Sequence, residues 1–301
     1  MHMQVERTQE EVALVALLYR VDGAPAVADI RRSLEDGRTP LEILTDSSAA
    51  LFGIEADSSL ELAAEDMREW SAGGITLLTP YSDDYPDQLR SVYDYPLAHF
   101  ARGRVKNDRL SAAIVGSRQV SEDGLAFASE LASYLAEDGI TVVSGLARGV
   151  DGSAHRAALK AGGRTVAVLG NGLDQVYPAE HRALQNEIAE TGLLVSQFRP
   201  KTRPTRQSFP QRNITMSAYS SITVIAEAAE ASGTRIQAHA AVRHARPLVI
   251  SAQVVRDTSW GAEYASGPYD VFVASDAREA RSAVREILTR STSAANWLRR
   301  G

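Results

Sequence analysis

Residues 112–151 read AAIVGSRQVSEDGLAFASELASYLAEDGITVVSGLARGVD, and this stretch decides the fold. Two short apolar runs each end in a glycine turn, and apolar residues at helical spacing lie between them. This order predicts two parallel strands joined by a crossover helix, the unit of nucleotide-binding α/β sheets. Ligands of such sheets collect at the carboxyl ends of the strands, where the turns Gly116-Ser117-Arg118 and Ser144-Gly145 are expected.

The same alternation continues towards the C-terminus. Further strands are expected near residues 165, 193, 222, 247 and 271, separated by helical patterns. We therefore expect an α/β protein with a Rossmann-like, doubly wound, mostly parallel sheet. The Gly- and Ser-containing residues 251–270, which include Trp260, are expected to form a surface segment.

The N-terminal part carries only helical patterns. Its breaks fall at Asp22-Gly23, Asp36-Gly37 and Phe52-Gly53. We expect three parts: a small helical domain over 1–72, a connector over 73–110 that packs on the sheet, and a Rossmann-like domain over 111–301. The Asp22-Gly23 turn has some likeness to a DNA-binding helix-hairpin-helix, but its surroundings are acidic, which favours an interaction or packing module.

Composition narrows the classes of protein. The chain of 301 residues is 44% hydrophobic and 23% charged, as ordinary soluble globular proteins are. It has no cysteine, which excludes disulfides and thiolate metal sites. No apolar run reaches the roughly 18 residues that span a bilayer, and the first residues are polar. We expect a cytoplasmic protein with no membrane partner and no signal peptide.

Charge is unevenly distributed. The net charge is −6, yet residues 1–80 hold 15 acidic against 6 basic side chains, so the remainder carries +3. No acidic residue lies between Thr191 and Ala226. An acidic first part therefore precedes a part with a local basic patch, which is compatible with a nucleic-acid ligand.

Small or polar residues follow five of the expected strands. They are Gly116-Ser117-Arg118, Ser144-Gly145, Gly170-Asn171-Gly172, Ser196 and Glu227 to Gly233. Glycine turns and helix N-termini expose backbone N–H groups, so several of them on one edge favour a phosphate-binding crevice, to which Arg118 and Arg148 add positive charge. The alternative is that the glycines only permit tight turns.

Known nucleotide motifs are absent from these turns. The turn Gly145 to Gly149 is not followed by the Gly-Lys-Ser/Thr of a Walker A loop, and no Gly-x-Gly-x-x-Gly follows a strand. ATP hydrolysis and NAD chemistry are therefore not supported, and we expect no catalytic residue, no cofactor and no metal. Asp151 and His155, four residues apart, could exchange a proton, but a helix cap and a packed histidine are the preferred interpretation.

The segment 197–213 is the second informative feature and reads QFRPKTRPTRQSFPQRN. It has five basic residues, three prolines and no acid, so we expect an extended loop that tracks a nucleic-acid backbone, with Phe209 stacking on a base. A solvated basic loop is the alternative. The residues expected to bind DNA or phosphate are Gly116, Ser117, Arg118, Ser144, Gly145, Arg148, Gly170, Lys201, Arg206, Phe209, Arg212 and Asn213.

These motifs resemble the DNA-processing protein family, DprA, also called Smf. The resemblance rests on Ala113 to Gly172, Tyr177-Pro178, Phe209-Pro210-x-Arg212-Asn213 and Ser232-Gly233-Thr234. It implies a non-enzymatic, dimeric protein that binds and protects single-stranded DNA in natural transformation and loads the recombinase RecA onto it. It also implies DNA contacts from Gly116 to Arg118, from the Ser144-Gly145 turn, and from Phe209, Arg212 and Asn213. The chain departs from the family in several motifs, and we expect no winged helix after the helix at 277–290.

Two other functions stay open at this point. The same fold occurs in nucleotide sensors and in nucleoside-monophosphate phosphoribohydrolases, although the Pro-Gly-Gly-x-Gly-Thr-x-x-Glu motif of those hydrolases has no counterpart at Glu227 to Thr234. A protein-interaction scaffold would fit the acidic N-terminal part but would leave the basic segment unexplained.

Overall fold

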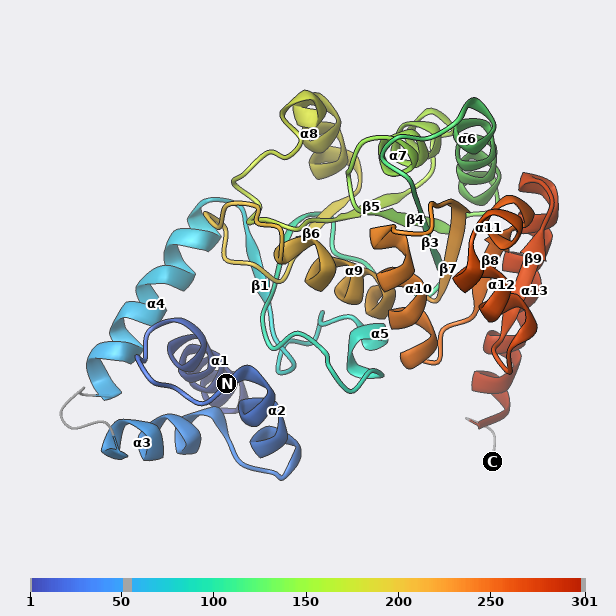
Figure 1. Cartoon of the computed structure of the whole chain (residues 1–301). Helices are drawn as coiled ribbons and strands as arrows, with labels where there is room; N and C mark the ends of the chain where they lie inside the picture. The colour runs from blue at the N-terminus through green and yellow to red at the C-terminus, as the bar shows by residue number, and fades with distance from the viewer. Residues whose placement is uncertain (1, 51–55, 299–301) are drawn as a thin grey trace.

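The computed structural model describes residues 2–50 and 56–298, so the expected break at Phe52-Gly53 lies outside the described residues. The described chain forms a nine-stranded sheet with helices on both faces (Figure 1). The strands are β1 (Thr76–Leu78), β2 (His99–Gly103), β3 (Ser111–Gly116), β4 (Thr141–Ser144), β5 (Thr165–Val168), β6 (Leu193–Ser196), β7 (Ile222–Glu227), β8 (Leu248–Ser251) and β9 (Val271–Ala274).

The strand order shows where a ligand site is expected. The order is β1-β2-β6-β5-β4-β3-β7-β8-β9, in which β1, β2 and β6 pair antiparallel and the strands from β6 to β9 pair in parallel. Along the chain, β4, β5 and β6 are added in turn on one side of β3, and β7 then pairs with the other side of β3. The switch point therefore lies between β3 and β7, and the predicted doubly wound, mostly parallel sheet is confirmed.

Helices cover both faces because the central strands are apolar on both. Along β3, Ala112 and Ile114 face one hydrophobic core, and Ala113 and Val115 face another. In Figure 1, α6 (Glu122–Glu137), α7 (Val150–Lys160) and α8 (Arg182–Thr191) lie on one side of the sheet. The helices α9 (Ser208–Tyr219), α10 (Gly233–Arg243) and the short α5 (Asp87–Arg90) lie on the other side.

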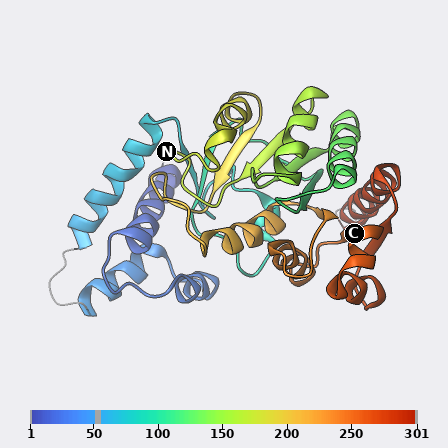
Figure 2. The same cartoon turned by 45° about the horizontal axis from the view of Figure 1, so that its top comes forward.

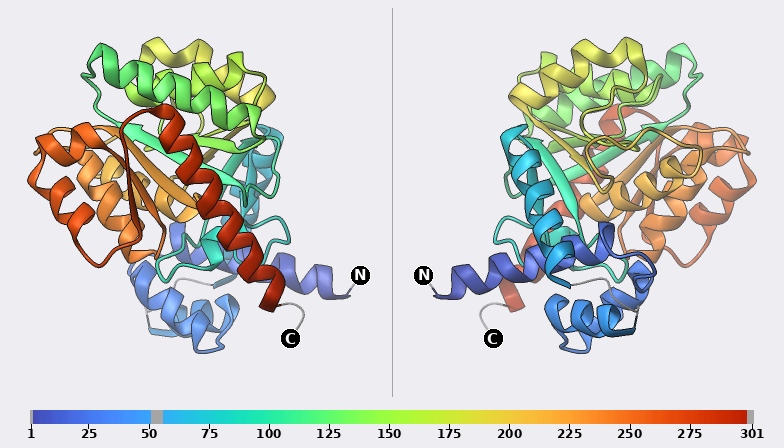
Figure 3. Two further views of the ribbon diagram at one scale, coloured as in Figure 1. Left: turned by 90° about the vertical axis from the view of Figure 1, so that its right-hand side faces the viewer. Right: turned by 90° about the vertical axis from the view of Figure 1, so that its left-hand side faces the viewer.

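The two ends of the sheet carry the remaining helices (Figure 2). At one end are α1 (His2–Tyr19), α2 (Val27–Glu35), α3 (Pro40–Ala50) and α4 (Ala56–Ala72), and at the other are α11 (Ala252–Asp257), α12 (Ser259–Ser266) and α13 (Ala277–Leu298). Figure 3 shows α13 running diagonally across its end of the molecule and, from the opposite side, α4 beside the edge strand β1.

The N-terminal helices share a hydrophobic core with the sheet. Leu14 and Leu17 of α1 and Trp70 of α4 belong to the same buried cluster as Phe100 of β2 and Leu194 of β6. The Trp70 and Phe100 rings meet edge to face, with centroids 4.9 Å apart. The expected division of the chain at residues 72 and 110 stays a prediction.

Two segments expected to be irregular are helical. Residues 208–213 of the predicted extended loop form the start of α9, because Pro210 lies in the first helical turn, where its missing N–H would have no partner in the helix. Residues 252–266 form α11 and α12, and Trp260 is buried at 1% exposure rather than lying on the surface. Ser251 and Thr258 cap these helices by accepting hydrogen bonds from Val254 and Gly261.

Candidate nucleic-acid interface

The turns after β3 and β4 lie against each other at the carboxyl ends of these strands. The N–H of Val150, at the start of α7, donates to the Ser117 carbonyl over 3.3 Å. Gly149 has φ 71°, and a side chain there would overlap the Ser117 carbonyl. A glycine is therefore required at residue 149, both for its left-handed backbone and for the close approach of the two turns.

Arg212 connects these turns to α9 from inside the protein. Its guanidinium lies against Gly145, where any Cβ would overlap Nη1. Nη1 donates to the Val168 carbonyl over 3.2 Å and lies 3.7 Å from Asp151 Oδ2. Burial lowers the pKa of Arg212 and raises that of Asp151, and their attraction opposes both shifts.

Arg212, predicted as a phosphate contact, lies inside the protein, and its contact with a phosphate stays a prediction. The residue is 4% exposed, because the segment that carries it is a helix packed on the sheet rather than an extended loop. Arg212 therefore holds the ends of β4 and β5 and the start of α7 in place. Ser144 has a similar structural role, since its buried hydroxyl donates to the Ile114 carbonyl over 2.7 Å.

A cation and two aromatic rings form the outer surface of the same edge. Arg118 is exposed, and its guanidinium carbon lies 5.0 Å from the centroid of the Phe209 ring. The centroid of the Tyr177 ring lies 5.3 Å from that of the Phe209 ring, and Tyr177 comes from a different segment of the chain. Gly170 permits this packing, because a Cβ at residue 170 would stand 2.9 Å from the Phe209 ring. We call Arg118, Phe209 and Tyr177 the platform.

Tyr177 was not among the predicted site residues. It is 42% exposed, and its sequence signal was only the Tyr177-Pro178 pair, whose peptide bond is cis. The contact with Phe209 joins residues 32 positions apart in the sequence, so it could not be derived from local pattern.

The basic residues around the platform differ in whether a carboxylate already neutralises them. Arg118, Arg203 and Arg206 are exposed, and among the residues whose side chains the structure describes, 8–47 and 57–291, no carboxylate forms an ion pair with them. Arg148 instead pairs with Glu180, with Nε 2.5 Å from Oε1, and this partner raises the pKa of Arg148. Arg118, Arg203 and Arg206 are therefore the cations most available to an anionic ligand.

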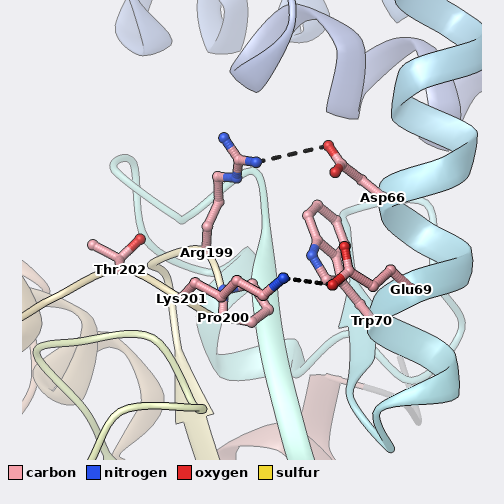
Figure 4. Close-up of a pocket in the computed structure, with 7 residues that line it drawn as sticks. All are labelled: Asp66, Glu69, Trp70, Arg199, Pro200, Lys201 and Thr202. Carbon is pink, nitrogen blue, oxygen red and sulfur yellow. Dashed lines mark hydrogen bonds and ion pairs between the residues drawn. The ribbon is translucent and has the colours of Figure 1, made fainter.

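Lys201 points towards α4 of the N-terminal helices (Figure 4). Its Nζ lies 2.5 Å from Glu69 Oε1 on α4, and this contact raises the pKa of Lys201. Arg199 lies 3.8 Å from Asp66 of the same helix and stacks over the Tyr19 ring. These side chains border a cleft of about 270 Å³ between α4 and residues 199–202. The Lys201 side chain is thus paired with α4, unlike those of Arg203 and Arg206.

Asn213 and the turn before α10 complete the edge. The Asn213 amide donates to the Gly233 carbonyl over 3.1 Å, which ties α9 to the first residue of α10. Ser232 caps α10 by accepting from Thr234. Asn213 is half-buried, so its position at the edge is set by this contact with Gly233.

Glu227, at the end of β7, occupies the N-terminus of α6. Its carboxylate accepts hydrogen bonds from the N–H and the hydroxyl of Ser121, the cap of that helix. Gly124 leaves room for it, since a Cβ there would overlap Oε2. The helix terminus that binds phosphate in many nucleotide-binding folds therefore already holds an anion from the protein itself.

The histidines near the edge are structural. His155 is fully buried, its Nδ1 lies 2.7 Å from the Thr165 hydroxyl, and burial lowers its pKa to about 3. The Asp151 carboxylate accepts a hydrogen bond from the Ala147 N–H over 3.3 Å. Asp151 is not the N-cap residue of α7, which is Gly149. Among the described residues, no three histidine or carboxylate side chains are placed to hold a metal ion.

A chain of serine, histidine and aspartate lies on the opposite side of the molecule. His244 Nδ1 lies 3.0 Å from the Ser217 hydroxyl and Nε2 lies 2.8 Å from Asp94. Ser217 is fully buried, so no substrate reaches its hydroxyl. The chain therefore serves to fasten the connector that carries Asp94 to α9 and α10.

The fold and the edge define a doubly wound α/β protein with a cation and aromatic platform at the carboxyl ends of its parallel strands. The profile of the family described as DNA recombination-mediator protein A matches residues 76–266, and the chain belongs to that family. This confirms the resemblance seen in the sequence motifs.

Individual relatives agree with this assignment. The chain is 33% identical over 197 residues to the DNA processing protein DprA of Bacillus subtilis, covering 65% of each protein. It is 40% identical over 174 residues to the protein Smf of Escherichia coli, covering 57% of this chain and 46% of the relative. The matched part thus spans about half to two-thirds of the length of these relatives.

Solved structures show the same architecture. DNA processing protein A from Streptococcus pneumoniae superimposes with a TM-score of 0.65 at 26% identity, covering 93% of this chain and 96% of that one. The protein of the same name from Helicobacter pylori, whose structure was described for its single-stranded DNA binding mode, has a TM-score of 0.62 at 25% identity. That match covers 70% of this chain and 96% of the Helicobacter chain. None of the helices described here has both the length and the apolar character needed to cross a membrane.

Proposed function

We propose that this protein binds single-stranded DNA at the platform and catalyses no reaction on it. The observation that carries the proposal is the cluster of Arg118, Phe209 and Tyr177 at the carboxyl ends of β3 and β5. Aromatic faces accept any unpaired base, whereas the bases of a duplex are already stacked on each other. The exposed Arg203 and Arg206 precede Phe209 in the chain and supply charge for the phosphates.

Family membership supports the biological part of the proposal. We place the protein in the protection of incoming DNA during natural transformation and recombination, in the cytoplasm, with RecA and a second copy of the chain as partners. The Helicobacter relative was described for binding single-stranded DNA, and this chain matches 96% of it. The filled N-terminus of α6 favours a strand bound across the outer edge over a free nucleotide bound at that helix.

The proposal is tested by titrating fluorescent oligothymidine with the protein at several salt concentrations. We expect Arg118→Ala to weaken binding about tenfold and to reduce the log–log salt slope by about 0.7, since one phosphate contact is lost. Arg243→Ala is the matched control. Arg243, like Arg118, lies 5.0 Å from the centroid of an aromatic ring, in its case that of Tyr93, but it is at the far end of α10. Absence of binding by the wild type at micromolar protein would refute the proposal.

The stacking part of the proposal has its own measurement. We expect Tyr177→Leu to weaken oligothymidine binding about tenfold with an unchanged salt slope, because a stacking surface is lost and no charge is. We also expect Tyr177→Leu to reduce the ratio of the affinity for oligothymidine to the affinity for an abasic strand. Tyr93→Leu, which removes a tyrosine that is 51% exposed elsewhere, should change neither quantity.

A further inference from the structure

The basic side chains of the segment 197–207, which precedes α9, fall into two groups. Its later cations, Arg203 and Arg206, are exposed and have no carboxylate partner in the described part of the chain. Its earlier cations, Arg199 and Lys201, point to Asp66 and Glu69 on α4, as Figure 4 shows. One continuous basic segment is thus partly neutralised by the acidic N-terminal helices.

The backbone of this segment is held independently of α4. The Gly172 N–H donates to the Thr202 carbonyl over 2.9 Å, and the Asp174 N–H donates to the Pro200 carbonyl over 3.0 Å. A glycine is required at residue 172, because a Cβ there would overlap the carbonyls of residues 199 and 200. The side chain of Lys201 can therefore leave Glu69 while its backbone stays in place.

The ion pair between Lys201 and Glu69 of α4 can be replaced by another partner, because both side chains are exposed to water. The Lys201 and Glu69 side chains are 74% and 58% exposed, and pairs of this kind gain little in water. Asp66 differs, because it is 8% exposed and accepts a hydrogen bond of 2.7 Å from Arg20 within the N-terminal helices. Glu69 is therefore the carboxylate that can be lost without disturbing the N-terminal core.

We propose that residues 199–201 form a second contact for the DNA backbone, which the Glu69 carboxylate occupies in the free protein and a phosphate replaces in the complex. The inference rests on the proposed function, since the competing anion is the phosphate of a strand already held at the platform. Lys201 and the platform residue Phe209 are eight residues apart, at most roughly 28 Å along an extended chain, so one strand can reach both. The Glu69 carboxylate on α4 thus limits the affinity for a strand that bridges the two contacts.

The experiment compares Glu69→Gln with the wild type on an oligothymidine of about thirty nucleotides. We expect Glu69→Gln to raise the affinity about two- to fivefold and to steepen the salt slope. Lys201→Gln removes the same pair from the other side. Combining it with Glu69→Gln should abolish the gain, because no cation is then released.

The outcomes separate this inference from the proposed function. If the wild type binds the strand and Glu69→Gln binds it no more tightly, the masking of Lys201 is refuted and the platform is not. A gain that persists in the double variant would also refute it, since the gain would then not come from Lys201. If the wild type does not bind the strand, the proposed function itself fails. Circular dichroism of each variant confirms that the fold is kept.

Discussion

At the scale of single residues, the site depends on one glycine and one buried arginine. Gly145 leaves the space that the Arg212 guanidinium fills, and Arg212 in turn faces Asp151 and the Val168 carbonyl. A buried guanidinium is tolerated only with such partners, because an unpaired charge inside a protein is costly. The exposed platform therefore stands beside a buried ion pair.

Gly145→Ala is expected to lower the free energy of unfolding by about 2–4 kcal/mol. The added methyl group would overlap Nη1, so Arg212 must move and leave Asp151 without its partner. Urea denaturation measures the change. Gly233→Ala is the control, since a Cβ there meets nothing within 4 Å, and it should change stability by less than about 0.5 kcal/mol. Equal effects of both substitutions would contradict this account.

At the scale of secondary-structure elements, the terminus of α6 shows how the fold assigns its anion-binding positions. Ser121 caps the helix, and Glu227 from the end of β7 adds a carboxylate at the same terminus. The positive end of the helix dipole and the free N–H groups stabilise this carboxylate. The β3–α6 connection is thereby fastened to β7, its neighbour across the switch point.

Glu227→Gln is expected to destabilise the protein by about 1–2 kcal/mol, because the amide keeps the shape but loses the charge at the helix terminus. Thermal and urea unfolding both report this change. Glu122→Gln offers a comparison on the same helix, since Glu122 lies in the first turn but is exposed, and only a few tenths of a kcal/mol are expected. A larger loss from Glu122→Gln than from Glu227→Gln would show that the buried carboxylate is not the main contributor.

At the scale of the whole molecule, the N-terminal helices and the sheet are joined by a common core. Phe100 of β2 packs between Trp70 of α4 and Tyr19 of α1 and is itself fully buried. Burial of this kind makes the two parts depend on each other for stability, because neither can expose that surface cheaply. The contact of α4 with the basic segment is therefore set by apolar packing and only adjusted by ion pairs.

Phe100→Ala is expected to lower the free energy of unfolding by about 3–5 kcal/mol. Hydrogen exchange should show reduced protection in α4 and in β6 together, because both lose the same packing partner. Phe272→Ala, at the other end of the sheet, should leave the exchange of α4 unchanged. Loss of protection confined to β6 after Phe100→Ala would mean that the N-terminal helices hold together without the shared core.

The sequence alone predicted the sheet and its class because parallel strands and helices have different apolar periods, and the glycine turns after β3, β4 and β5 mark the ends of these strands. It also predicted the family, since the motifs around Gly116, Ser144-Gly145 and Phe209 are local runs. It was wrong about the state of residues 208–213, because three nearby prolines suggested an extended chain although Pro210 is tolerated in a first helical turn.

Only the tertiary structure decided which charges are free. Arg118, Lys201 and Arg212 look alike in the sequence, yet one is exposed on Phe209, one pairs with Glu69 and one is buried beside Asp151. Tyr177 joined the platform in the same way, through a partner 32 residues away. A local sequence pattern specifies period and turn chemistry, whereas the partner of a long side chain depends on which distant elements the fold brings beside it.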